Sequence, residues 1–216
     1  MCERTEHALG TVQRSAGESV RGIVDWHPAF AFAHTFHVCM ERTGRLPTYG
    51  QFRDFALEDE LGRRMLGDPA KHKLEAEQLK GVPRDQARAA MRWRVGNAYY
   101  GFLREVYTVV SLRSRGIGLE VHPVADALFR ADAWAGRTVL SLRVGNAEFR
   151  RGDREGRKVR TEQLLADVRP ALHFLPIELG AATTYGRVHL PSRDHLEAAL
   201  RQIRQAGQLS AEGPAG

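Results

Sequence analysis

The most regular hydrophobic pattern of the chain lies between residues 83 and 114. Apolar side chains recur there at spacings of three and four residues, as on a helix with one buried face. They are Met91, Val95, Ala98, Phe102, Val106, Val109 and Leu112. Pro83 suits the first turn of a helix, and Gly116 and Gly118 would end it. The pattern therefore predicts one long helix over residues 83–114.

Shorter helical patterns precede this helix. One covers residues 28–42, and another covers about residues 69–80. Between them, Thr48 is placed to cap a helix, and Gln51 stands where a capping box needs its second side chain. These patterns predict a helical N-terminal region.

After the long helix, the apolar positions change to the alternation that is typical of strands. Gly136 and Arg137 can form the tight turn of a hairpin. Strands are predicted over residues 119–124, 127–134 and 138–144, followed by a helix over 159–168. Two further strands are predicted over 171–179 and 186–190. A last helix, capped by Ser192 with His195, is predicted to end at about residue 204. The second half is thus α/β, in the order α-β-β-β-α-β.

We expect four parts along the chain of 216 residues. They are a flexible N-terminus (1–18), a helical region (19–82), an α/β core (83–206) and a flexible tail (207–216).

Polar residues stand at three positions of the predicted core. Glu105 borders the apolar stripe of the long helix, Asp132 lies late in the first hairpin strand, and Ser141-Leu142-Arg143 lies in the second. Over about residues 95–190 this order resembles the PD-(D/E)xK nuclease-like superfamily. Its members carry Glu on the helix, Asp on the first hairpin strand and Glu-x-Lys on the second. The resemblance implies a restriction-endonuclease-like core in which carboxylates hold Mg²⁺ for phosphodiester hydrolysis.

The chain departs from this pattern at the second hairpin strand. Ser141 replaces a metal-binding carboxylate, and Arg143 can bind a phosphate but does not act as a base. An active site would need Glu162 as a migrated carboxylate and Lys158 as a migrated lysine, with Asp126 and Glu148 as weaker substitutes.

By this resemblance the catalytic residues are Glu105, Asp132, Arg143 and Lys158, and the Mg²⁺ ligands are Asp132 and Glu162. An alternative without catalysis is that Glu105 pairs with Arg143 and Asp132 caps the turn before Gly136.

The charge of the chain favours a polyanionic partner. Its formal net charge is +6 and its isoelectric point is about 9.7. This excess of positive charge suits binding to nucleic acid, and we expect DNA rather than RNA. An arginine-rich composition alone also produces such an excess. The candidate phosphate contacts are Arg88 and Arg92 on the long helix and Arg150, Arg151, Arg154, Arg157 and Arg160 after the hairpin. The alternative for the second group is a solvated loop.

Two other groups of residues are considered as sites for zinc and for a partner protein. His34, His37 and Cys39 could be considered for zinc, but no second ligand pair follows, and packing roles are expected. Phe30, Phe32 and Phe36 are candidates for an exposed patch of a protein-interaction subunit. A catalytically inactive accessory protein, a partner protein and a homodimer are alternatives that stay open.

The compartment is expected to be the cytoplasm. Two cysteines indicate no disulfide framework, and the first residues lack the apolar run of a signal peptide. The sequence contains no apolar stretch of membrane-spanning length, so we expect no membrane association.

Overall fold

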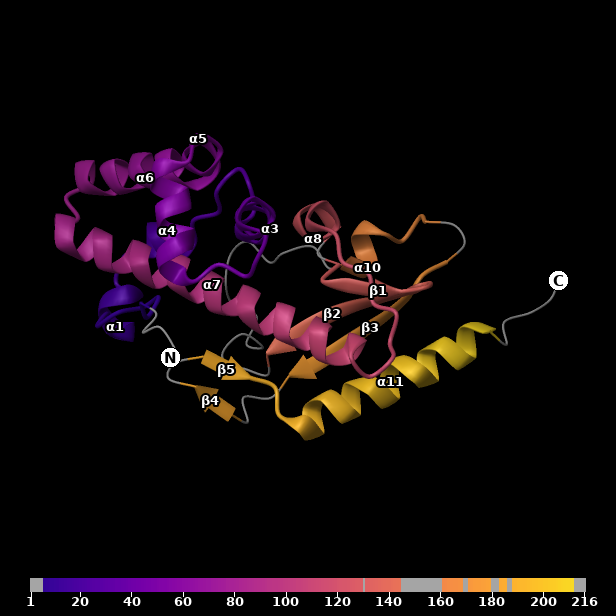
Figure 1. Ribbon diagram of the computed structural model, residues 1–216. Coiled ribbons are helices and arrows are strands. Elements are labelled where there is room, and N and C mark those ends of the chain that lie inside the picture. Colours follow the sequence, from indigo (N-terminus) through magenta and orange to yellow (C-terminus); the bar gives the residue numbers. More distant parts are fainter. Residues whose placement is uncertain are drawn as a thin grey trace. The chain divides into compact units, whose positions relative to one another are not determined.

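The computed structural model describes residues 6–129, 131–144, 161–168, 171–179, 183–185 and 188–211. The protein is a mixed α/β protein, mostly helical, with a small three-stranded sheet (Figure 1). The chain forms two compact units, residues 1–102 and 103–216. This division lies inside the long helix and not at residue 82, because the beginning of that helix packs against the segments that precede it.

The elements that the structure describes in unit 1 are all helices. They are α1 (Arg14–Gly17), α2 (Arg21–Val24), α3 (Phe32–Thr43), α4 (Tyr49–Glu58), α5 (Glu60–Gly62), the π-helix η1 (Arg63–Gly67), α6 (Asp68–Leu79) and the first part of α7 (Arg84–Arg113). The predicted capping box of α4 is confirmed, since Thr48 and Gln51 exchange both hydrogen bonds. The prediction of a single long helix from about residue 83 is confirmed by α7.

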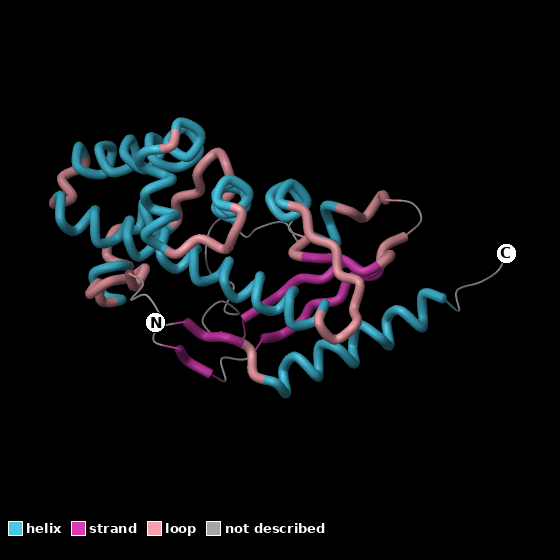
Figure 2. The backbone as a smooth tube through the Cα atoms, viewed as in Figure 1, coloured by secondary structure: helices cyan, strands magenta, loops and turns pink. Residues whose placement is uncertain are grey.

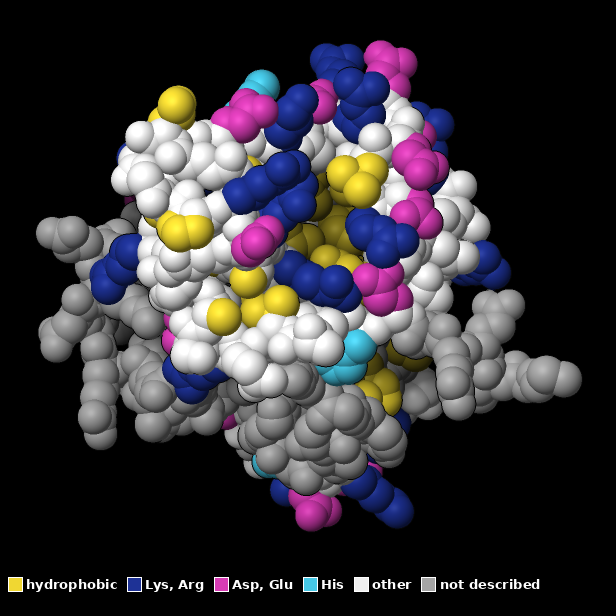
Figure 3. Space-filling view, turned by 90° about the vertical axis from the view of Figure 1, so that its left-hand side faces the viewer, with side chains coloured by type: hydrophobic (Ala, Val, Ile, Leu, Met, Phe, Trp, Pro, Cys, Tyr) yellow, Lys and Arg dark blue, Asp and Glu magenta, His cyan; other side chains and the backbone are white. Residues whose placement is uncertain are grey.

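Aromatic rings form one core of unit 1. The ring of Phe36 lies 4.2 Å from that of Phe52 and 5.0 Å from that of Phe102, measured between centroids. A second core joins α2 and α7 through Val20, Ile23, Ala87, Ala90 and Met91. On the face shown in Figure 3, Lys and Arg side chains surround a hollow lined with hydrophobic side chains.

The expectation of a loose segment over residues 1–18 is wrong for its described part. Ala8 and Leu9 are buried. A side chain on Gly96 of α7 would meet both residues, so glycine permits this close approach. The Tyr100 hydroxyl accepts a hydrogen bond from Ala8 N at 3.1 Å. Contacts with α7 that are remote in sequence therefore order this segment.

Unit 2 holds the sheet (Figure 2). After α7 come α8 (Pro123–Phe129), β1 (Ala133–Ala135), β2 (Thr138–Val144), α10 (Thr161–Leu164), β3 (His173–Leu179), β4 (Thr183–Tyr185), β5 (Val188–Leu190) and α11 (Arg193–Ala211). β1 and β2 form the predicted antiparallel hairpin, and β3 is parallel to β2. β4 and β5 form a separate antiparallel pair.

Two strand predictions in this unit are wrong. Residues 127–134 were expected as a strand, but residues 123–129 are helical and only Ala133–Ala135 is β1. Residues 119–124 contribute only one bridge, between Glu120 and Trp134. The physical reason is a helix start: Pro123 suits a first turn, and the ring of His122 accepts a hydrogen bond from Val124 N at 3.2 Å.

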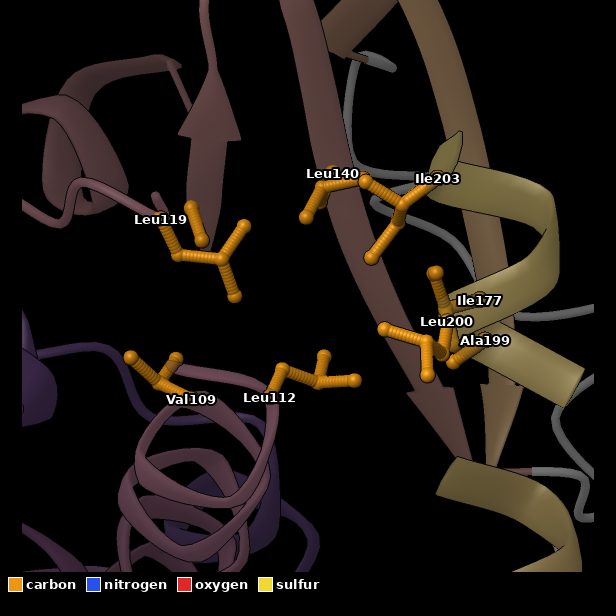
Figure 4. Packing of buried hydrophobic residues seen from close by; sticks show 9 residues of the cluster. Val109, Leu112, Leu119, Leu140, Ile177, Ala199, Leu200 and Ile203 are labelled. Atoms are coloured by element: carbon orange, nitrogen blue, oxygen red, sulfur yellow. The ribbon is translucent and has the colours of Figure 1, made fainter. Parts of the chain in front are cut away.

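The core of unit 2 lies on one face of the sheet. Val109 and Leu112 from α7 are buried together with Leu140 from β2 and Leu200 from α11 (Figure 4). α11 contributes residues at helical spacing, and its predicted cap is confirmed, because Ser192 and His195 are joined by reciprocal hydrogen bonds. Among the described residues, no helix is long and apolar enough to cross a membrane.

Candidate functional site

In unit 2, two aspartates act electrostatically on one buried glutamate. Glu105 belongs to α7, Asp126 to α8, and Asp132 directly precedes β1. Burial raises the pKa of Glu105 to about 9, and the negative charges of Asp126 and Asp132 add to the shift. Glu105 is therefore protonated at neutral pH. We call these three residues the carboxylate cluster.

The apolar pattern of α7 explains the position of Glu105. Its neighbours one turn away, Phe102 and Val109, are both buried. Glu105 lies between them on the same side of the helix, as the sequence predicted. Desolvation follows from this position, and it is the largest cause of the raised pKa.

The helix α8 brings Asp126 into the cluster. His122 stands before the helix, and its carbonyl oxygen accepts a hydrogen bond from Asp126 N at 3.1 Å. Asp126 thus occupies the first turn of a short helix whose start is fixed by His122 and Pro123. The sequence predicts Asp126 only as a weaker substitute ligand.

Asp132 is held by the hairpin. Its N–H donates to the carbonyl oxygen of Leu140 at 3.2 Å, and its carboxylate accepts from Leu142 N at 2.5 Å. β1 begins at the next residue, where Ala133 pairs with Leu140. Asp132 therefore stabilises the hairpin at a different place from the turn before Gly136.

The parallel strand β3 adds a carboxylate that sequence reasoning missed. Glu178 pairs in register with Arg143, and Pro176 pairs with Ser141. No local pattern could have shown this, because the register between β2 and β3 exists only in the folded sheet. The side chain of Arg143 lies outside the described part of the structure, so its pairing with Glu105 stays a prediction.

Of the two residues predicted to replace the missing carboxylate and lysine, the structure describes only Glu162. Glu162 lies on α10, and its Oε2 is buried. Its role as a metal ligand stays a prediction. Lys158 lies outside the described residues. Within the described residues, no three Asp, Glu, His or Cys side chains form a group that could hold a metal ion.

The candidate phosphate contacts differ in their surroundings. Arg88 is exposed on α7. Arg92 donates hydrogen bonds to Glu6 and to the carbonyl oxygens of His7 and Ala8, so it anchors the N-terminal segment. Arg150, Arg151, Arg154, Arg157 and Arg160 lie outside the described residues.

The histidines and the cysteine of α3 have packing surroundings. His37 and Cys39 are buried, and the His37 ring lies 5.3 Å from that of Phe102. Burial, with a contribution from Asp59, raises the pKa of the Cys39 thiol to about 11, which suits an inert thiol. The proposed patch of three phenylalanines is not formed as expected, because Phe36 is completely buried while Phe30 is 44% exposed.

No protein-family model matches the sequence, and no curated protein or solved structure is significantly similar to it. The function is therefore inferred from the residues of the chain itself.

Proposed function

We propose that the protein binds nucleic acid and that unit 2 is a nuclease-like core. The observation that carries the proposal is the arrangement around the hairpin: Asp132 precedes β1, Glu105 acts on it from the preceding helix, and β3 continues the hairpin in parallel. An antiparallel hairpin extended by a parallel strand after a connecting helix is the order expected for a restriction-endonuclease-like core. The departure from this order is Ser141 on β2, where the nuclease-like superfamily carries a carboxylate.

The charge of the chain supports a nucleic acid as the partner. The segment of residues 145–160, which follows β2, contains six Lys or Arg and three Asp or Glu residues. Each cation that neutralises a phosphate releases counterions, which favours binding at low salt. Because phosphate contacts carry no sequence information, this segment supports binding without base specificity.

Fluorescence polarisation with labelled duplex DNA, single-stranded DNA and RNA tests the proposal. Replacing Arg150, Arg151 and Arg157 together by Gln should weaken DNA binding at least about tenfold at 100 mM NaCl. A control that removes the same charge from the exposed Arg42, Arg45 and Arg201 should retain affinity. Equal losses in both variants, or no binding by the unaltered protein, would contradict the proposal.

Cleavage is a second candidate function, because Glu105 and Asp132 lie on the helix and beside the hairpin strand that carry carboxylates in the nuclease-like superfamily. Carboxylate oxygens are the ligands that Mg²⁺ prefers, and a bound Mg²⁺ would polarise a phosphate and activate water. The described residues do not, however, provide a complete set of ligands, and Ser141 stands where a carboxylate is expected. We therefore derive no catalytic step for the cluster.

A cleavage assay separates an endonuclease from an inactive binding protein. Plasmid and single-stranded DNA would be incubated with Mg²⁺ or Mn²⁺, and the products of the unaltered protein compared with those of Asp132→Asn and Glu105→Gln. Both substitutions keep the size of the side chain, so lost cleavage would indicate lost chemistry. Binding without cleavage under any of these conditions would favour a catalytically inactive accessory protein.

A further inference from the structure

Two arginines of unit 1 hold a single carboxylate. Arg53 lies on α4 and Arg92 on α7, and both donate to the side chain of Glu6 in the N-terminal segment. Arg53 reaches Oε2, and Arg92 reaches Oε1 at 2.8 Å. Two guanidinium groups from different helices thus converge on one anion, which we call the anion site.

The fold positions both arginines before any anion binds. Arg92 also donates to the carbonyl oxygens of His7 and Ala8, and Arg53 is held by the carboxylate of its neighbour Asp54 at 3.0 Å. Less rotational freedom is therefore lost when these arginines bind an anion, which favours binding.

Glu6 can leave the anion site without unfolding of the segment. The burial of Ala8 and Leu9 anchors the backbone, whereas the Glu6 side chain is 32% exposed and that of Arg53 is 46% exposed. Exposed ion pairs contribute little to stability, so a competing anion in solution faces a small cost. Guanidinium groups bind phosphate in the same two-pronged way as carboxylate.

We propose that a backbone phosphate of the bound nucleic acid replaces the Glu6 carboxylate between Arg53 and Arg92, so that Glu6 is a built-in competitor of binding. This inference rests on the proposed function. It adds a phosphate site in unit 1 to the basic segment of unit 2, and it makes Glu6 an element that limits affinity.

The row of arginines on α7 supports phosphate as the occupant. Arg84 and Arg88 precede Arg92 at intervals of one helical turn, about 6 Å along the axis. Both are exposed, and neither has an ion-pair partner among the described residues. With Glu6 displaced, Arg92 has no carboxylate partner and keeps its hydrogen bonds to the His7 and Ala8 carbonyl oxygens, so a polyanion can contact it together with Arg84 and Arg88.

The test compares Glu6→Gln with Glu18→Gln. Both substitutions remove one negative charge from the N-terminal part, and Glu18 is a matched control because its carboxylate, 39% exposed, pairs with Arg14 in an ordinary ion pair one turn away on the helix. Glu6→Gln should tighten binding of duplex DNA about threefold to tenfold at 100 mM NaCl, whereas Glu18→Gln should change it less than about twofold. Adding Arg53→Gln to Glu6→Gln should remove the gain.

A second probe separates this inference from the proposed function. Tripolyphosphate should raise the melting temperature of Glu6→Gln more than that of the unaltered protein or of Glu18→Gln. This result without any nucleic-acid binding would leave the anion site standing and overturn the proposed function. Equal responses of Glu6→Gln and Glu18→Gln to both DNA and tripolyphosphate would overturn the inference, as would a gain that persists in the double variant.

Discussion

At Glu105, a carboxyl group that water would ionise at neutral pH lies in an interior that already holds two negative charges. The surroundings favour the neutral acid, and the group keeps its proton up to a pKa of about 9. Asp132 differs, because the backbone N–H of Leu142 donates to its carboxylate. The burial of Glu105 and the backbone hydrogen bond of Asp132 thus give two neighbouring carboxyl groups different surroundings.

Glu105 should make the stability of the protein depend on pH. Its pKa of about 9 in the folded state exceeds the ordinary value of 4.5 of the unfolded chain, so the unfolded state releases this proton first and the stability falls between these two pH values. Glu105→Gln should raise the free energy of unfolding by about 1 to 3 kcal/mol at pH 8 in EDTA, and much less at pH 5. Urea denaturation at both pH values measures this, with the exposed Glu120→Gln as control.

Cys39 should react slowly as long as the protein is folded. Its burial and its pKa of about 11 leave little thiolate at pH 8. In a Cys2→Ser variant, reaction with a thiol-specific disulfide reagent should be at least about a hundredfold slower in buffer than in 8 M urea. Comparable rates in the two solvents would mean that α3 opens readily.

At the scale of elements, the packing of helices and strands depends on residues that let two backbone segments come close together. In unit 1, Gly62 and Gly67 lie against the last turn of α4, where a Cβ atom would come within 2.2 Å of Phe55 O and 2.1 Å of Ala56 O, respectively. In unit 2, the short hairpin is extended by the two hydrogen bonds of Asp132. The glycines thus allow helices to pack closely, and the side chain of Asp132 adds hydrogen bonds to a hairpin with a first strand of only three residues.

Gly67→Ala should destabilise unit 1. The added methyl group would clash with a backbone carbonyl that cannot move alone, and a loss of about 2 kcal/mol or more is expected. Gly101 is the matched control, since it lies in α7 with nothing within 4 Å of a Cβ atom. Gly101→Ala should stabilise the protein by about 0.5 to 1 kcal/mol, because alanine favours a helix. Thermal and urea unfolding measure both changes.

The cap of the hairpin can be tested at Asp132. Asp132→Ala removes the acceptor of Leu142 N and should cost about 1 to 3 kcal/mol. Asp132→Asn keeps an oxygen acceptor and should recover most of this loss. Hydrogen exchange of the Leu142 amide, followed by NMR, should accelerate in the alanine variant and stay slow in the asparagine variant.

At the scale of the whole molecule, a helical unit and a unit with a sheet share the helix α7. Positive charge occurs in both units, on α7 and in the segment of residues 145–160. Both units therefore contribute cations to the net charge of +6, and each can add contacts to the nucleic-acid binding that we propose.

The salt dependence of DNA binding should report these contributions. A plot of the logarithm of the association constant against that of the NaCl concentration should be linear, with a slope of about −0.9 for each phosphate neutralised. The variant lacking Arg150, Arg151 and Arg157 should show a slope smaller in magnitude by about 2 to 3. Retention of the full slope would place the phosphate contacts elsewhere.

The sequence alone determined the elements whose signals are local. The capping box of Thr48, the long helix α7, the hairpin turn at Gly136 and the cap at Ser192 follow from neighbouring residues, and the structure has each of them. The helix α8 could have been found in the same way, because His122 and Pro123 form its start. The alternation of residues 127–134 concealed it.

Only the tertiary structure decided which distant residues meet. The parallel register that pairs Arg143 with Glu178, and the electrostatic contact of Asp126 with Glu105, depend on packing across the sheet and between helices. The burial of Ala8 and the binding of Glu6 by Arg53 and Arg92 likewise join segments far apart in the chain. Such contacts leave no periodic pattern, since each depends on the packed positions of elements that a local sequence does not encode.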